Sequence, residues 1–87
     1  MAVTIKQLEE HIFSFEEIRV FFRASQNDLV PEYPYKNTFS DDTFLFQLKD
    51  RIEKTYPGLN FEIVDGRGMV SHIHGKRLRE IRQTYVR

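Results

Sequence analysis

Residues 40–58 read SDDTFLFQLKDRIEKTYPG, and this stretch carries the strongest structural signal in the chain. Its apolar residues recur at helical spacing, at Leu45, Leu48, Ile52 and Tyr56. Ser40 or Asp41 is suited to cap a helix, acids follow in the first turn, and Pro57-Gly58 ends the pattern. The stretch therefore predicts an amphipathic helix. Phe46 stands nearly opposite the apolar stripe, either under a loop or at a contact surface.

A first helix is predicted at the start of the chain, over Val3 to Phe13. Ile5, Leu8 and Ile12 recur at helical spacing, and Thr4 with Gln7 forms the pattern of a capping box.

The segment from Glu16 onward changes its period from helical to alternating. Ile18, Val20 and Phe22 alternate with Arg19, Phe21 and Arg23, which predicts a strand with two different faces. An alternative is that Ser14 and Glu17 form a second capping box and that the segment continues as helix. The β-branched and aromatic residues favour the strand.

A loop is predicted over Ser25–Pro34, which contains a polar run and two prolines. Beyond it, some alternation in residues 33–39 allows a short edge strand, where proline is tolerated. Tyr33 and Tyr35 would then share one face. These tyrosines are candidate binding residues, and the alternative is that they pack into the core beneath the proline loop.

Past the central helix, the chain shows the pattern of a β-hairpin. Leu59, Phe61 and Ile63 alternate with polar residues, Asp65–Gly68 supplies turn residues, and Met69–His74 returns as the antiparallel partner. Gly75 ends this hairpin. A final helix follows, with a narrow apolar stripe at Leu78, Ile81 and Tyr85.

The order of elements is therefore α-β-β-α-β-β-α, with the second strand the least marked. Helices interleaved with antiparallel pairs predict an α+β fold, a small two-layer sandwich in which helices pack on an antiparallel sheet of three to four strands. The 87 residues leave room for one domain, residues 1–87.

Composition narrows the classes of function. The chain has no cysteine, which excludes a disulfide framework, a thiolate metal site and cysteine-based catalysis. No apolar run approaches the about 20 residues that span a bilayer. We therefore expect a cytoplasmic protein that binds no membrane, and the residue patterns predict neither a cofactor nor a metal site.

Charge is distributed unevenly along a chain whose formal total is zero. Residues 1–65 carry seven Lys and Arg against twelve Asp and Glu, a net charge of −5. Residues 66–87 carry six basic residues against Glu80 alone, a net charge of +5. Because summed charge steers encounters with oppositely charged partners, the carboxyl-terminal quarter is the first place to look for function.

The basic residues of the final helix form the main candidate binding surface. On a helical wheel Lys76 and Arg79 lie opposite the apolar stripe, while Arg77 and Arg82 flank it. Arginine holds carboxylate or phosphate through two hydrogen bonds, and Arg67 at the hairpin tip joins the surface if the turn folds toward the helix. The alternative is that these residues only complement the helix dipole and the solvent.

His72 and His74 lie two residues apart on a predicted strand, so both project to one face. Such a pair suits metal binding or acid/base chemistry near neutral pH. A third ligand is missing from the neighbouring sequence, although His11 is a candidate in the fold. The alternative is a pair of ordinary surface histidines.

A family resemblance adds a second reading of this region. Asp65–Lys76 followed by Leu78–Arg82 resembles the hairpin and last helix of small mRNA-interferase toxins, whose fold is like that of double-stranded-RNA-binding domains. In that family a single histidine acts on the RNA backbone. The resemblance covers about a fifth of the chain and lacks the family's Gly-x-His motif on an earlier strand.

The sequence favours a non-enzymatic binding or inhibitor-type protein that uses the basic final helix and the hairpin tip. An acidic protein surface is the preferred partner, since Tyr and Arg are enriched at binding hot spots. In size alone, the chain is similar to phage and mobile-element inhibitors of nucleic-acid machinery, which include anti-CRISPR proteins. The alternative function is a nucleic-acid-binding module that uses the same basic patch. A third hypothesis is a histidine-dependent RNase toxin. The oligomeric state stays open.

Overall fold

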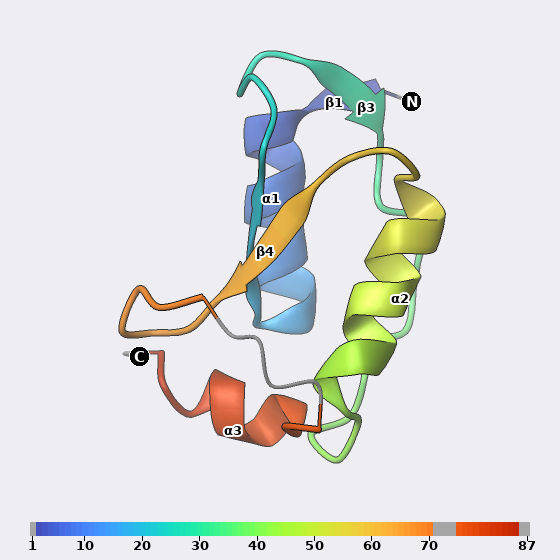
Figure 1. The fold of residues 1–87 in the computed structure, drawn as a ribbon. Coiled ribbons are helices and arrows are strands. Elements are labelled where there is room, and N and C mark those ends of the chain that lie inside the picture. Colours follow the sequence, from blue (N-terminus) through green and yellow to red (C-terminus); the bar gives the residue numbers. More distant parts are fainter. Residues whose placement is uncertain (1, 71–74, 86–87) are drawn as a thin grey trace.

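The fold is α+β, as the sequence predicts. The computed structural model describes residues 2–70 and 75–85 (Figure 1). Seven elements follow one another in these residues: β1 (Ala2–Thr4), α1 (Ile5–Glu16), β2 (Arg19–Phe22), β3 (Leu29–Pro31), α2 (Leu45–Thr55), β4 (Phe61–Val64) and α3 (Leu78–Arg82).

Helix α1 is fixed at both ends by its own sequence. The predicted capping box is confirmed, since the Gln7 N–H donates to Thr4 Oγ1 and the Thr4 N–H donates to Gln7 Oε1, at 3.2 and 3.0 Å. Glu17 ends the helix in the left-handed conformation, with φ 59°. The helix thus runs three residues past the predicted end at Phe13, while Val3 belongs to β1.

Strand β2 confirms the alternating pattern, and the helical alternative for this segment is wrong. It pairs antiparallel with β4, with Arg19 opposite Val64 and Phe22 opposite Phe61. Val20 and Phe22 are buried, whereas Arg19 and Phe21 face solvent. In Figure 1 helix α1 lies behind this sheet, so the buried residues face the helix.

The second strand lies earlier than predicted, inside the segment that the sequence indicated as a loop. Strand β3 pairs antiparallel with β1, with Val30 opposite Val3. Residues 33–39 form no strand. The described strands make two two-stranded sheets, β1–β3 and β2–β4, in place of one sheet of three to four strands.

Helix α2 has the predicted apolar stripe, but it begins later than its expected caps. Its N-cap is Phe44, whose N–H donates to Gln47 Oε1 at 3.0 Å. Ser40 and Asp41 instead belong to the turn that leads into the helix, where the Thr43 N–H donates to the Ser40 carbonyl.

The predicted hairpin turn forms after β4. The Asp65 N–H donates to the Met69 carbonyl at 2.9 Å, and Val70 makes a bridge with Val64. The rest of the expected return strand, which includes His72 and His74, lies outside the described residues.

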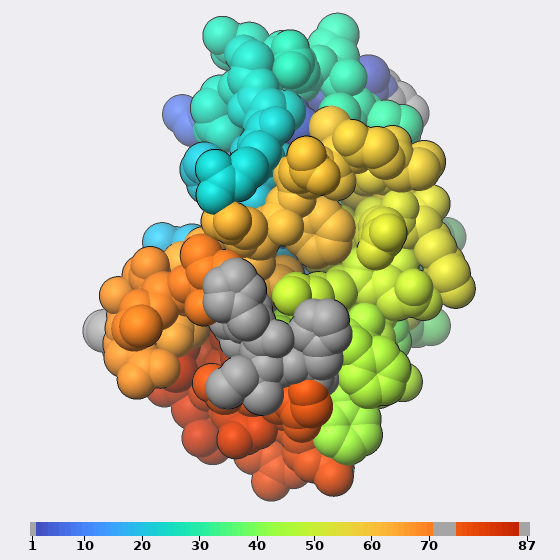
Figure 2. Space-filling view, in the orientation of Figure 1, coloured from blue at the N-terminus to red at the C-terminus, as the bar shows by residue number. Residues whose placement is uncertain are grey.

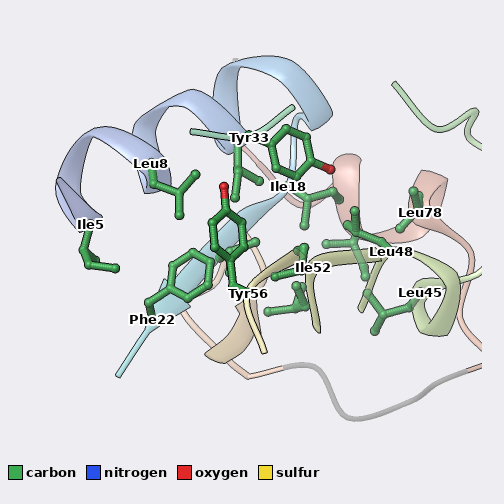
Figure 3. Packing of buried hydrophobic residues seen from close by; sticks show 14 residues of the cluster. Ile5, Leu8, Ile18, Phe22, Tyr33, Leu45, Leu48, Ile52, Tyr56 and Leu78 are labelled. Carbon is green, nitrogen blue, oxygen red and sulfur yellow. The ribbon is translucent and has the colours of Figure 1, made fainter. Parts of the chain in front are cut away.

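The core lies between α1, α2, α3 and the buried face of β2–β4 (Figure 3). Its fully buried side chains come from every helix, for example Leu8, Leu48 and Leu78. The apolar stripes that the sequence predicts for the three helices therefore meet in one cluster.

Tyr56 connects this core to the β1–β3 sheet. Its ring packs edge-on against Phe22 at 5.9 Å, and its hydroxyl donates to the Pro31 carbonyl at 2.8 Å. Burial raises the pKa of Tyr56 to about 12.

This pKa predicts how stability depends on alkaline pH. The folded-state pKa is raised above the unfolded value of 10.0, so the contribution is complete below pH 10 and is lost as the pH rises toward 12. Tyr56→Phe is expected to lower stability at pH 8 and to flatten the loss between pH 10 and 12. Urea unfolding at a series of pH values checks this, and an unchanged slope would contradict it.

Candidate functional site

The final helix is held against the start of α2 by backbone pairing. The Leu45 N–H donates to the Lys76 carbonyl at 2.7 Å, and the Leu78 N–H donates to the Thr43 carbonyl at 2.8 Å. Leu78 and Ile81 are fully buried, as the stripe predicts. This pairing places the basic residues at the start of α3 beside the N-terminus of α2.

Arg82 flanks the stripe as predicted, but the expectation that its guanidinium points outward is wrong. It is only 6% exposed. Its guanidinium donates to the carbonyls of Glu16 and Phe39 at 3.0 and 2.8 Å, and to Asp41 Oδ1 at 2.7 Å. Arg82 therefore ties α3 to α1 and to the loop before α2, and it is not available to a partner.

Arg77 and Arg79 stay at the surface. Arg79 forms an ion pair with Asp42 in which both side chains are exposed. The Arg77 guanidinium lies 4.6 Å from the centre of the Phe44 ring and donates to the Asp42 carbonyl at 2.8 Å. Within residues 2–70 and 75–85 Arg77 has no carboxylate in an ion pair, so its charge is open to an acidic partner.

We call Phe44, Lys76, Arg77 and Arg79 the arginine surface. Phe44 is half-buried, and its ring stacks on that of Phe46 at 5.8 Å with 14° between the planes. The surface thus combines one aromatic ring with three cations at the junction of α2 and α3. Such a ring under an arginine stabilises the guanidinium in an outward-facing position.

The hairpin tip folds toward α3, as the sequence allowed, but toward its far end. The Gly66 N–H donates to Thr84 Oγ1 at 2.6 Å, just beyond the C-terminus of α3. Arg67 pairs with buried Asp65 at 3.0 Å. Figure 1 shows the tip at the opposite end of α3 from α2, so Arg67 does not join the arginine surface.

Asp65 organises this turn. Its carboxylate accepts the Met69 N–H at 3.0 Å and the Arg67 N–H at 2.9 Å. These bonds, that of Met69 first, and the Arg67 guanidinium hold the pKa of Asp65 below its ordinary value. The charges of Asp65 and Arg67 are therefore paired with each other within the turn.

Tyr85 fixes the end of the chain to the β2–β4 sheet. Its hydroxyl accepts the Arg19 N–H at 2.8 Å and donates to the Val64 carbonyl. Arg19 and Val64 are opposite each other in the sheet, so the hydroxyl bridges the end of the ladder. Burial raises the pKa of Tyr85.

Of the two candidate tyrosines, Tyr33 lies in the core and Tyr35 packs against its edge. Tyr33 is 5% exposed, and its hydroxyl donates to Glu16 Oε2 at 2.5 Å; burial raises its pKa. Tyr35 is half-buried and shares a hydrogen bond with Thr55. Their rings lie 5.1 Å apart, although the strand on which the sequence would have placed them on one face does not form.

Sequence reasoning missed Glu16, the most buried charge in the described residues. Its carboxylate accepts from Tyr33, the Thr38 hydroxyl, the Phe39 N–H and Arg51, at 2.5 to 3.0 Å. A signal was present, because position 16 continues the spacing of Ile5, Leu8 and Ile12 on the buried stripe of α1.

The histidines yield no site in the residues that the structure covers. His72 and His74 lie outside them. His11 is exposed and stacks on Phe15 with ring centres 5.9 Å apart. Across residues 2–70 and 75–85, His, Asp and Glu form no group of three that could hold a metal ion.

Comparisons with known proteins add no assignment. No protein-family model matches the chain, and neither a curated protein nor a solved structure matches it. In the described part of the chain, none of the helices has the length and apolar character needed to cross a bilayer.

Proposed function

We propose that this chain is a non-enzymatic binding domain that docks on an acidic protein surface through the arginine surface. The observation that carries the proposal is Arg77, an exposed guanidinium supported by Phe44 and without a carboxylate partner in the described residues. Arginine and aromatic side chains are enriched at protein interfaces, especially among the residues that contribute most to affinity.

The pairing of Arg79 supports a protein partner over nucleic acid. Asp41 and Asp42 stand beside Arg82 and Arg79 and already compensate part of their charge. Nucleic-acid binding depends on several cations that each neutralise a phosphate, and adjacent carboxylates oppose it. A protein partner needs only one or two carboxylates, placed to meet Arg77 and to compete for Arg79.

An inhibitory role and a cytoplasmic location are further parts of the proposal. A small domain that covers a functional surface of its partner inhibits by occupancy alone. Small size and the separation of acidic from basic segments support that use. The absence of cysteine fits a reducing compartment.

A peptide-display selection tests the proposed surface without a known partner. Peptides selected on the immobilised domain are expected to be rich in Asp and Glu. Arg77→Glu is expected to weaken their binding about 30-fold or more, because it removes a central charge and introduces repulsion. Isothermal titration of one selected peptide measures the change.

The control for this experiment is Lys36→Glu, which reverses an exposed cation in the loop before α2. It should bind the peptide as the parent domain does. Selected peptides without acidic residues, or equal affinity of the Arg77→Glu domain, would reject the arginine surface. Retention on single- or double-stranded oligonucleotides that falls steeply with salt would favour nucleic acid instead.

A further inference from the structure

A second surface, separate from Arg77 and Arg79, runs along the outer side of α2. An open groove lies between this helix and the chain that enters β4, and its lining includes Phe46, Lys49, Glu53, Leu59 and Phe61. Figure 1 shows α2 and the start of β4 next to each other, and Figure 2 shows their surfaces side by side on the same face.

The two ends of this groove differ in shape and chemistry. At the start of α2, Phe46 is a large apolar side chain that is 48% exposed. At the other end, Leu59 and Phe61 are only partly buried and line the hollow beside Gly58. One end therefore offers an aromatic ring and the other an apolar recess on the same face.

The charges on the helix between these ends are complementary to each other. Asp50 and Lys54 form an ion pair within the helix at 3.0 Å. Lys49 and Glu53, which also stand four residues apart, form no ion pair with any residue in 2–70 or 75–85. Among the described residues, the groove thus carries one cation, Lys49, and one carboxylate, Glu53, that form no ion pair.

We propose that the occupant of this groove is a second copy of the same chain, bound about a two-fold axis with the two α2 helices antiparallel. An axis near residue 51 brings Lys49 of each copy opposite Glu53 of the other. Position 46 lies about 7.5 Å along the helix from this axis, so Phe46 meets the C-terminal end of α2 in the second copy, beside the Gly58–Phe61 part of that groove. One two-fold rotation therefore pairs the opposite charges and also brings the apolar ends together, as an isologous interface requires.

Sedimentation velocity across a concentration series tests the dimer. The domain is expected to change reversibly from monomer to dimer as its concentration rises. Phe46→Ala is expected to weaken the dimer about 30-fold, because the ring is the apolar anchor of the interface. Glu10→Lys, a charge reversal at an exposed position of α1, serves as the control and should leave the equilibrium unchanged.

Charge reversal makes the test specific for the antiparallel arrangement. Lys49→Glu alone and Glu53→Lys alone each place like charges opposite one another and should give monomers. An equimolar mixture of these two variants should dimerise, since each copy then meets an opposite charge at both contacts. The double variant Lys49→Glu/Glu53→Lys should dimerise as well.

Two results would overturn the proposal. A protein that stays monomeric up to about 1 mM has no such dimer, since weaker association falls outside specific binding. A dimer that survives both single charge reversals, with no gain on mixing, uses another surface. Neither result bears on the arginine surface, whose test uses a different variant and a peptide ligand.

Discussion

Glu16→Ala is expected to lower the free energy of unfolding by about 3–5 kcal/mol, the loss typical of a buried ion pair that loses one partner. Its carboxylate is fully buried and accepts hydrogen bonds from four groups. Removal leaves the Tyr33 hydroxyl without its acceptor, and it leaves the Arg51 guanidinium with the Asn37 carbonyl but without its carboxylate. Because a small domain has a total stability of about 5–15 kcal/mol, a large part of the variant should be unfolded.

Glu16→Ala should first loosen the long irregular segment before α2. Glu16 connects α1 to Thr38 and Phe39, and Arg51 of α2 lies over the Phe39 ring at 3.7 Å. No helix or strand orders residues 32–44. The buried carboxylate therefore supplies the acceptors that a regular element would otherwise provide.

Urea unfolding followed by far-ultraviolet circular dichroism measures this loss. Glu10→Ala is the matched control, since it removes an exposed carboxylate from the same helix and should change stability by less than about 0.5 kcal/mol. Glu16→Gln keeps the shape and two hydrogen-bonding groups but loses the charge, so its loss should be smaller than that of Glu16→Ala. Equal unfolding midpoints for Glu16→Ala and Glu10→Ala would show that the network contributes nothing.

Local patterns were sufficient for the helices and for the existence of strands β2 and β4, but the sequence did not predict that these two strands pair with each other. The stripe of α2 and the alternation in β2 each depend on neighbours a few residues away, and the structure confirms both. The β1–β3 pair depends on a contact between residues about 27 positions apart, such as Val3 with Val30. Three-residue strands carry too little pattern to reveal such a contact, so the loop prediction for Ser25–Pro34 was partly wrong.

In the candidate site, too, exposure was predicted correctly where it depends on nearby sequence, and wrongly where it depends on residues far away in the sequence. The helical wheel correctly indicated that Arg79 faces outward, since exposure opposite a buried stripe is a local property. Arg82 flanks that stripe, and its burial depends on the carbonyls of Glu16 and Phe39, which lie far away in the sequence. For Phe46 the sequence left two alternatives open, a place under a loop or at a contact surface, and the structure shows a ring that is 48% exposed.

Gly66→Ala is expected to destabilise the fold by about 3 kcal/mol, at the upper end of the usual cost of overpacking. A Cβ atom at this position would lie 1.7 Å from the Thr84 carbonyl oxygen and 2.6 Å from the Tyr85 nitrogen. Both are backbone atoms, so no side-chain rotation relieves the overlap. The turn and the chain beyond α3 have to move apart.

That movement should break the contacts by which the end of the chain reaches the sheet. The hydrogen bond from the Gly66 N–H to Thr84 is lost first, and the Tyr85 hydroxyl then leaves Arg19 and Val64. Since burial raises the pKa of Tyr85, its release should return that pKa toward the ordinary value of 10.0. A tyrosine that titrates earlier in an ultraviolet titration of the variant would report the release directly.

Gly75→Ala separates this close approach from a general cost of replacing glycine. A Cβ at Gly75 meets no atom of residues 2–70 or 76–85 within 4 Å beyond its chain neighbour, and the residue is exposed. Thermal unfolding should therefore leave Gly75→Ala within about 0.5 kcal/mol of the parent protein, with Gly66→Ala well below it. If both variants unfold together and Tyr85 titrates as in the parent, then the hairpin turn does not pack on the end of α3, and the hairpin tip is free to reach a partner.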